Sequence, residues 1–307
     1  MPLAVALTVR PSPTLCNGLL STLPDDDSSV ERRIAGVSVV IPVKDDAGPL
    51  ERCLRALAAQ SVAPAEIVVV DNASADGSAE VALRFGARVV AESAPGIAAA
   101  AARGYDAARC SVIGRMDADC VPDARGVERL EQHFATHPRD AAVTGLAHFV
   151  DGPRLLRRPG AALYLGAYLL CVGAALAHPP LFGSNCALRR SEWMRIRDTV
   201  HRSDLLLHDD IDLSVHLGPV ARIRVDPGLR MGIAVRPFTE GGLALRFRRG
   251  MHSILTHWPA ELPWLRFGRR LAATVQVFGG DELSRVEELS RGGAAARHPY
   301  RRRPRPR

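Results

Sequence analysis

The stretch Ser111-Val112-Ile113-Gly114-Arg115-Met116-Asp117-Ala118-Asp119 is an apolar run of strand length that ends in two carboxylates one residue apart. Two further acidic clusters, Asp71-Asn72 and Asp209-Asp210-Ile211-Asp212, also fall where we expect a β-strand to end. Carboxylates on the loops after strands are where an α/β fold gathers a ligand. The three clusters therefore predict an α/β protein with a ligand site at one edge of its sheet.

Apolar runs and helical patterns alternate on both sides of this stretch. We expect strands at 37–43, 67–70, 88–90 and 111–116, and helices at 49–57, 76–85 and 97–109. Such alternation is typical of a mostly parallel sheet with helices on both faces. Beyond Pro122 the pattern weakens to a helix at 126–135, a strand near 141–149 and basic helical segments within 243–275.

Composition sets the domain organisation and excludes a nucleic-acid protein. The chain has 307 residues, 47% of them hydrophobic, which is ample for a buried core. Its net charge of +7 is concentrated in residues 291–307, which carry seven arginines and no acid. We expect a poorly ordered extension at 1–35, a folded α/β domain at 36–235, a helical region at 236–290 and a disordered tail at 291–307. The tail is expected to be solvated, and its alternative partner is an anionic lipid surface.

Cysteine usage and hydropathy indicate the compartment. The six cysteines show no zinc-ligand spacing, which indicates reduced thiols and a cytoplasmic protein. The apolar stretch Leu3 to Val9 precedes its arginine, the opposite of the polarity of a signal peptide. The uncharged run from Ala161 to His178 is long enough to cross a membrane, but its glycines and alanines favour a buried or membrane-facing helix. We expect the protein to lie in the cytoplasm, peripheral to the inner face of the membrane.

The sequence lacks both glycine-rich phosphate loops. The first strand runs into Pro42-Val43-Lys44-Asp45-Asp46, which is neither a dinucleotide fingerprint nor a P-loop. Phosphate must therefore be held by side chains or by a metal. Asp117 and Asp119 point to the same side of an extended segment, where they can share Mg²⁺ or Mn²⁺ with a diphosphate. The alternative is a solvated acidic turn, because Asp-x-Asp is a common sequence.

The other two acidic clusters each allow two interpretations. Asp71 either hydrogen-bonds a nucleotide or caps the turn at Asn72, and we favour the nucleotide because neighbouring side chains can cap the turn. The cluster that contains Asp209, Asp210 and Asp212 either tunes a general base or forms the exposed first turn of a helix. The residues alone leave that choice open.

Five motifs together resemble a family 2 glycosyltransferase with a GT-A fold. They occur in the order of that family and cover residues 36 to about 215. The matching segments are Val39-Val40-Ile41-Pro42-Val43, Val69-Val70-Asp71-Asn72-Ala73-Ser74-Ala75-Asp76-Gly77, Asp117-Ala118-Asp119, Gly183-Ser184-Asn185 and Asp209-Asp210-Ile211-Asp212-Leu213. The resemblance implies a Rossmann-like sheet, a helical C-terminal region and a nucleotide-sugar donor at the carboxyl edge of the sheet.

The resemblance also implies a role for individual residues. Pro42, Val43 and Asp45 would line the base pocket, and Asp71 would contact the base. Asp117 would lie on the ribose side, and Asp119, with Asp117, would hold the metal that bridges the diphosphate. The family's acidic motif usually reads Glu-Asp-x-Asp, which makes Asp210 the catalytic base beside Asp209. The acceptor side would comprise Gly183, Ser184, Asn185 and Asp212.

Two departures from the family pattern limit what carries over. Many relatives have Ala-Arg-Asn-x-Gly in the third helix, where this chain has Ala100-Ala101-Ala102-Arg103-Gly104, so Arg103 would have to supply a donor contact from a shifted position. The Gln-x-x-Arg-Trp motif of processive synthases is absent, which favours transfer of a single sugar.

We therefore expect an inverting, metal-assisted transferase that moves a sugar, most simply from a UDP-sugar, to a hydroxyl of a sugar, a lipid carrier or a small molecule. One rival is a non-catalytic nucleotide-binding scaffold, which only the altered third helix supports. Another is a nucleotidyltransferase, which usually has a glycine-rich basic loop where this chain has Lys44-Asp45-Asp46-Ala47.

Overall fold

The computed structural model describes residues 34–235 and 242–275, which belong to the unit Arg33–Arg307. Most of the expected extension at 1–35, the whole expected tail at 291–307 and residues 276–290 lie outside the described residues. The boundaries expected between the domains remain predictions.

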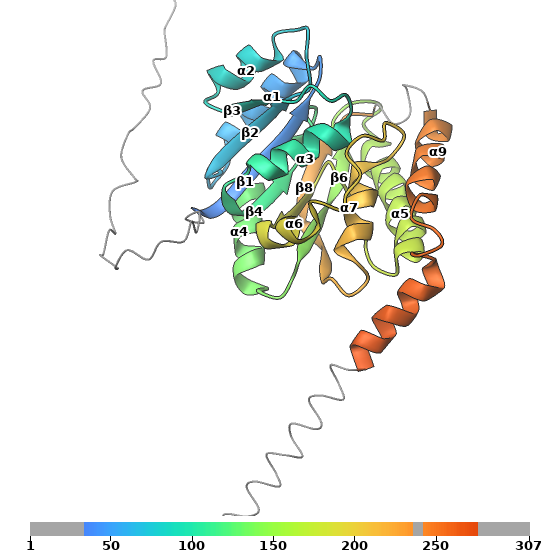
Figure 1. Ribbon diagram of the computed structural model, residues 1–307. Coiled ribbons are helices and arrows are strands. Elements are labelled where there is room, and N and C mark those ends of the chain that lie inside the picture. Colours follow the sequence, from blue (N-terminus) through green and yellow to red (C-terminus); the bar gives the residue numbers. More distant parts are fainter. Residues whose placement is uncertain (1–33, 236–241, 276–307) are drawn as a thin grey trace, which may run out of the picture. The chain divides into compact units, whose positions relative to one another are not determined.

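Within the described residues, eight strands form one sheet in the order β3-β2-β1-β4-β7-β6-β8-β5 (Figure 1). In that order the strands are Arg88–Ala91, Glu66–Asp71, Ile34–Val43, Cys110–Arg115, Cys186–Arg189, Ala142–Phe149, Ile223–Ile233 and Val121–Pro122. The first four, β3, β2, β1 and β4, are parallel. Their positions agree with the strands expected from the sequence.

Helices cover both faces of the sheet because β1 alternates its side chains between two apolar cores. Val39, Ile41 and Val43 join the core covered by α1 (Ala47–Ala58), α2 (Ser78–Arg84), α4 (Gly126–Thr136) and α5 (Arg157–Leu176). Val40 joins the core covered by α3 (Ile97–Ala107), α6 (Arg190–Ile196) and α7 (Asp209–Leu217). The α/β fold class expected from the sequence is thus confirmed.

The second half of the sheet is mixed. Strand β7 runs antiparallel to both β4 and β6, whereas β6 and β8 are parallel. The sequence did not predict β7 or β8. Strand β7 has only four residues, and Pro227-Gly228 interrupts the apolar pattern of β8.

The helical C-terminal region expected from the sequence is present where the structure describes it. Helix α9 spans Gly242–Leu255, and residues 263–275 form a further helix (Figure 1). Helix α5 contains most of the uncharged run and is, among the described helices, the one long and apolar enough to cross a membrane, with a mean hydropathy of 1.6. Only 22% of that window is buried, so the buried-helix alternative is disfavoured.

Candidate active site

The parallel strands bring the first two acidic clusters to one edge of the sheet. Strands β2, β1 and β4 are neighbours and point the same way, so their carboxyl ends lie side by side. Asp71 ends β2, and Asp117 and Asp119 follow β4. This edge is where an open α/β sheet binds its ligands.

Arg115, the last residue of β4, joins two of the acidic motifs. Its Nη2 lies 3.1 Å from Asp117 Oδ1 and 3.2 Å from Asp209 Oδ2, and its side chain is only 4% exposed. Burial alone would lower the pKa of Arg115, but the two carboxylates outweigh it and raise that pKa, so the guanidinium stays charged. We call Arg115, Asp117, Asp119, Ser184, Asp209 and Asp210 the carboxylate cluster.

The loop at Gly183 and Ser184 closes the carboxylate cluster from the side of β7. The Ser184 hydroxyl donates to Asp117 Oδ2 at 2.5 Å, and the Gly183 N–H donates to Asp210 Oδ2 at 2.9 Å. A Cβ at Gly183 would overlap the Arg115 guanidinium, so only glycine allows this close approach. Residues that are far apart in the sequence therefore share one set of polar contacts.

The third acidic cluster does not follow a strand, which corrects the sequence-based expectation. Asp209 and Asp210 are instead in the first turn of α7, where unpaired N–H groups favour negative side chains. Asp210 Oδ1 accepts the N–H of Ile211 at 2.8 Å, which orients the carboxylate. The first turn of α7 is nonetheless part of the site, because Arg115 and Gly183 contact it.

Asp209 differs electrostatically from an exposed aspartate. Burial raises the pKa of Asp209 to about 6, and the charges of Asp210 and Asp117 add to that rise while Arg115 opposes it. The Arg115 ion pair therefore offsets repulsion among three neighbouring carboxylates.

Asp117, Asp119 and Cys120 bring their ligand atoms within 4.8 Å of one another. Carboxylate oxygens suit Mg²⁺ or Mn²⁺, whereas the Cys120 thiol does not. Burial raises the pKa of Cys120 well above its usual range, and the thiol stays protonated. Asp117 also binds Arg115 and Ser184, so a metal at this position would meet Asp119 together with an Asp117 carboxylate that is already oriented.

On the donor side, the predicted residues also organise the loops. Asp71 Oδ1 accepts the N–H of Ser74 at 3.0 Å, so this carboxylate does cap its turn. Asp45 accepts the N–H of Ala75 at 2.7 Å, which ties the loop after β1 to the loop after β2. Pro42 and Val43 are buried at the end of β1, directly beside this pair of loops.

Three further predicted residues lie outside both the carboxylate cluster and the donor-side loops. Arg103 lies on the exposed side of α3, and the buried Asn185 amide donates to the carbonyls of Leu146 and Leu229 at 2.9 and 3.0 Å. Asn185 therefore fastens β6 to β8. Asp212 is 2% exposed and contacts histidines in a separate cluster.

Sequence analysis missed two parts of the site. Arg115 was treated as an ordinary strand residue, although a charge inside an apolar run was a signal of a buried ion pair. The second is Tyr164 of α5, whose phenol lies near the charges of Arg246 of α9 and Asp210. Burial raises the pKa of Tyr164, the charge of Arg246 opposes that rise and the charge of Asp210 adds to it.

The fold and the carboxylate cluster together define a GT-A-type sheet with an acidic ligand site at its carboxyl edge. The family model for glycosyl transferase family 2 matches residues 38–195, which is half of the chain. The chain belongs to glycosyltransferase family 2.

Three known proteins illustrate how far the similarity reaches. Glycosyltransferase AglE of Haloferax volcanii is 32% identical over 101 residues, which are 30% of this chain and 33% of AglE. The chain thus matches only about a third of that curated relative.

The other two are solved structures. The mannosyltransferase PcManGT of Pyrobaculum calidifontis, solved with GDP-mannose and Mn²⁺, has a TM-score of 0.52 and 21% identity, covering 89% of this chain and 84% of its own. The glucosyl-3-phosphoglycerate synthase of Mycobacterium tuberculosis, solved with Mn²⁺, UDP-glucose and phosphoglyceric acid, has a TM-score of 0.52 and 22% identity, covering 72% of this chain and 79% of its own. At these identities the similarity shows the fold.

Proposed function

We propose that the protein transfers a single sugar from a nucleotide-diphosphate sugar, with a UDP-sugar as the expected donor, to an acceptor hydroxyl. The observation that carries the proposal is the Arg115 bridge, which holds Asp117 and the first turn of α7 in one site. Family membership and the donors in the two solved relatives support the same chemistry.

The donor would lie along the carboxyl ends of β1, β2 and β4. The base would rest on Pro42 and Val43 between Asp45 and Asp71, and the ribose would lie beside Asp117. Asp119, with Asp117, would hold Mn²⁺ or Mg²⁺, as the carboxylate donor set allows. The bound ion would supply positive charge to the departing diphosphate. Arg103 is a weaker candidate for a donor contact because it lies outside the cluster.

Asp210 is the proposed general base. Its Oδ2 is oriented by the Gly183 N–H, and each carboxylate oxygen keeps further capacity to accept a proton. Asp210 would take the proton of the acceptor hydroxyl as the acceptor oxygen bonds to the anomeric carbon. The bond from that carbon to the diphosphate oxygen breaks in the same displacement, which inverts the carbon. Asp209 would position Arg115 rather than take a proton.

A hydroxyl of a lipid carrier that also bears a phosphate is the acceptor class that the surface near α9 favours. A hollow of about 420 Å³ there has apolar walls and two arginines, and it is lined by Leu206, Phe247, Arg248, Arg249, Met251, His252 and Leu255. An apolar chain next to a phosphate would match that lining. Exposed leucines on α5 provide a second apolar surface, which supports a peripheral position on the cytoplasmic face of a membrane.

The decisive test is a thermal-shift screen of nucleoside diphosphates and nucleotide sugars with and without Mn²⁺, on the wild type and Asp119→Ala. We expect one nucleotide family to raise the Tm in the presence of Mn²⁺. The corresponding gain in the free energy of unfolding is up to about 3 kcal/mol when the ligand concentration is a hundred times its Kd. Asp119→Ala should abolish the metal-dependent part of that shift. The variant Asp123→Ala, which changes a nearby aspartate outside the cluster, is the matched control.

The products then identify the reaction. Release of a nucleoside diphosphate on adding an acceptor supports sugar transfer, whereas release of pyrophosphate would establish nucleotidyl transfer instead. Donor binding without turnover on sugar, lipid-phosphate and small-molecule acceptors would favour the non-catalytic scaffold. Absence of any nucleotide shift would overturn the proposal.

A further inference from the structure

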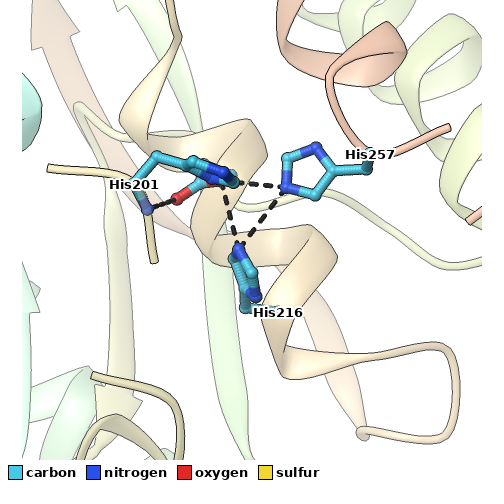
Figure 2. Close-up of side chains that lie close together, drawn as sticks. His201, His216 and His257 are labelled. Atoms are coloured by element: carbon cyan, nitrogen blue, oxygen red, sulfur yellow. Dashed lines mark hydrogen bonds and ion pairs between the residues drawn. The ribbon is translucent and has the colours of Figure 1, made fainter. Parts of the chain in front are cut away.

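Three histidines converge on one carboxylate of α7 (Figure 2). We call His201, Asp212, His216 and His257 the histidine cluster. Asp212 and His216 are one turn apart on α7, His201 precedes that helix, and His257 follows α9. The cluster therefore joins three segments that are separate in the sequence.

All three imidazoles approach the same oxygen. Asp212 Oδ1 lies 2.8 Å from His201 Nδ1, 3.0 Å from His257 Nε2 and 3.3 Å from His216 Nε2. The other oxygen, Oδ2, accepts the backbone N–H of His201 at 2.9 Å, which fixes the carboxylate in this orientation. Asp212 is thus held with Oδ1 facing three ring nitrogens.

The tautomer of His257 leaves an electrostatic conflict. Its Nδ1 lies 2.9 Å from the Ser253 carbonyl oxygen, and since a carbonyl can only accept, Nδ1 carries the proton. In a neutral ring Nε2 then has a lone pair, which faces the carboxylate Oδ1. Two acceptors at 3.0 Å require a proton or a cation between them. A ring whose second nitrogen donates to a carbonyl is also the usual arrangement of a metal-bound histidine.

The spacing of the four ligand atoms suits a tetrahedral ion. They lie within 4.8 Å of one another, and His216 Nε2 is 3.4 Å from His257 Nε2. Zinc bonds of about 2.0–2.1 Å place tetrahedral ligands about 3.3 Å apart. Four of the separations between ligand atoms, 2.8, 3.0, 3.3 and 3.4 Å, lie within about 0.5 Å of that value. Three nitrogens and one oxygen favour Zn²⁺ over the oxygen-seeking Mg²⁺ and Mn²⁺.

We propose that the histidine cluster binds one Zn²⁺ ion that fastens His201 and His257 to α7. The site is separate from the carboxylate cluster, because Asp212 contacts His201 whereas Asp209 contacts Arg115. His201 is 42% exposed, which provides a route for the ion from solvent. Bound zinc would steady the helix that carries Asp209 and Asp210 in its first turn.

The test uses the full chain, stripped with a chelator and titrated with Zn²⁺ or with Co²⁺ as a spectroscopic probe. We expect one equivalent of Zn²⁺ per chain at this site and the visible absorption of four-coordinate Co²⁺, both retained in Asp119→Ala. His216→Ala and His257→Ala should each lower the affinity by more than the roughly 10–100-fold that loss of an outer-shell partner costs. His252→Ala is the matched control, because His252 is a histidine of α9 that pairs with Asp204 and is not part of the histidine cluster.

The exposed ligand keeps the test decisive if the buried substitutions prevent folding. His201→Ala should fold, and it should also weaken Co²⁺ binding and change the Co²⁺ spectrum. Equal Co²⁺ binding by the wild type and His201→Ala would overturn the proposal. So would a wild-type protein that binds Co²⁺ only through Asp119, or one that binds no Co²⁺, which would mean that protons rather than a metal occupy the cluster.

Discussion

Helix α7 contributes side chains to two polar clusters that differ in the groups surrounding their carboxylates. The carboxylate cluster at its first turn has oxygen ligands, a buried arginine and residues held by the Gly183 loop. The histidine cluster around Asp212 has mainly nitrogen ligands and joins the end of α9. Asp212 is thus part of the acidic motif in sequence but belongs to the other cluster in space. The comparison teaches that side chains of one short acidic motif can belong to two separate sets of polar contacts.

The largest expected effect is on kcat and comes from Asp210, the proposed base in the first turn of α7. Asp210→Asn keeps an oxygen that can accept the Gly183 N–H but removes the base, so kcat should fall by about 10²–10⁴-fold with the donor-induced Tm shift unchanged. The measurement is release of nucleoside diphosphate in the presence of the acceptor. Asp209→Asn is the matched comparison and should lower kcat less. If Asp209→Asn abolishes turnover and Asp210→Asn does not, the two roles are reversed.

Removing the bridge should have the next largest effect. Arg115→Met leaves Asp117 and Asp209 without their shared partner at a buried position, so the free energy of unfolding should fall by about 3–5 kcal/mol. Urea unfolding measures the change. Arg55→Met breaks an exposed pair with Glu51, whose arginine is 65% exposed, and should cost less than about 1 kcal/mol. Similar losses of unfolding free energy in the two variants would show that the buried ion pairs of Arg115 stabilise the protein no more than an exposed ion pair does.

Acid should lower the free energy of unfolding through His178, which lies just after α5. Burial, followed by the nearby charges of Arg266 and Arg270, lowers the pKa of His178 to about 4. The unfolded chain binds this proton near pH 6.5 and the folded chain does not, so stability is fully present above pH 6.5 and is lost as pH falls toward 4. The shift corresponds to about 3 kcal/mol.

His178→Gln should remove that dependence. Arg266 Nη2 donates to His178 Nε2 at 3.0 Å, and the glutamine carbonyl can accept the same bond. Unfolding free energies measured from pH 7 to pH 4 should therefore fall less steeply in the variant than in the wild type. Parallel curves for the two proteins would rule out His178 as a source of acid sensitivity.

The sequence predicted the side of the sheet that is built from local patterns. The run at 67–70 is β-branched throughout and the run at 111–116 is largely apolar apart from Ser111 and Arg115, and parallel strands with buried faces require such runs. Asp117, Asp119 and Asp210 could be located because their motifs are short and ordered. Strand β7 was missed because four residues carry too little periodicity.

The histidine cluster could not be predicted from the sequence, because it depends on contacts between residues that are far apart in the chain. His201 and His257 are far apart in the sequence, and nothing in their spacing indicates that they meet at Asp212. Resemblance to the family placed Asp212 with the acceptor, whereas the structure pairs it with histidines. Contacts that form only when distant segments pack together leave no local pattern in the sequence from which they could be predicted.

The smallest expected effect concerns α5, whose buried side packs on α7 through Val172 and Leu176. Its outer side carries Leu163 and Leu170, which are 77% and 73% exposed. If this side rests on a membrane, changing both to serine should lower the binding constant for anionic vesicles about thirtyfold in a sedimentation assay, because each leucine would contribute about 1 kcal/mol when partly buried in lipid. Leu83→Ser, at a 62% exposed site on α2, is the control. Unchanged sedimentation would leave α5 without a membrane role and would turn attention to residues 291–307, whose deletion tests charge alone.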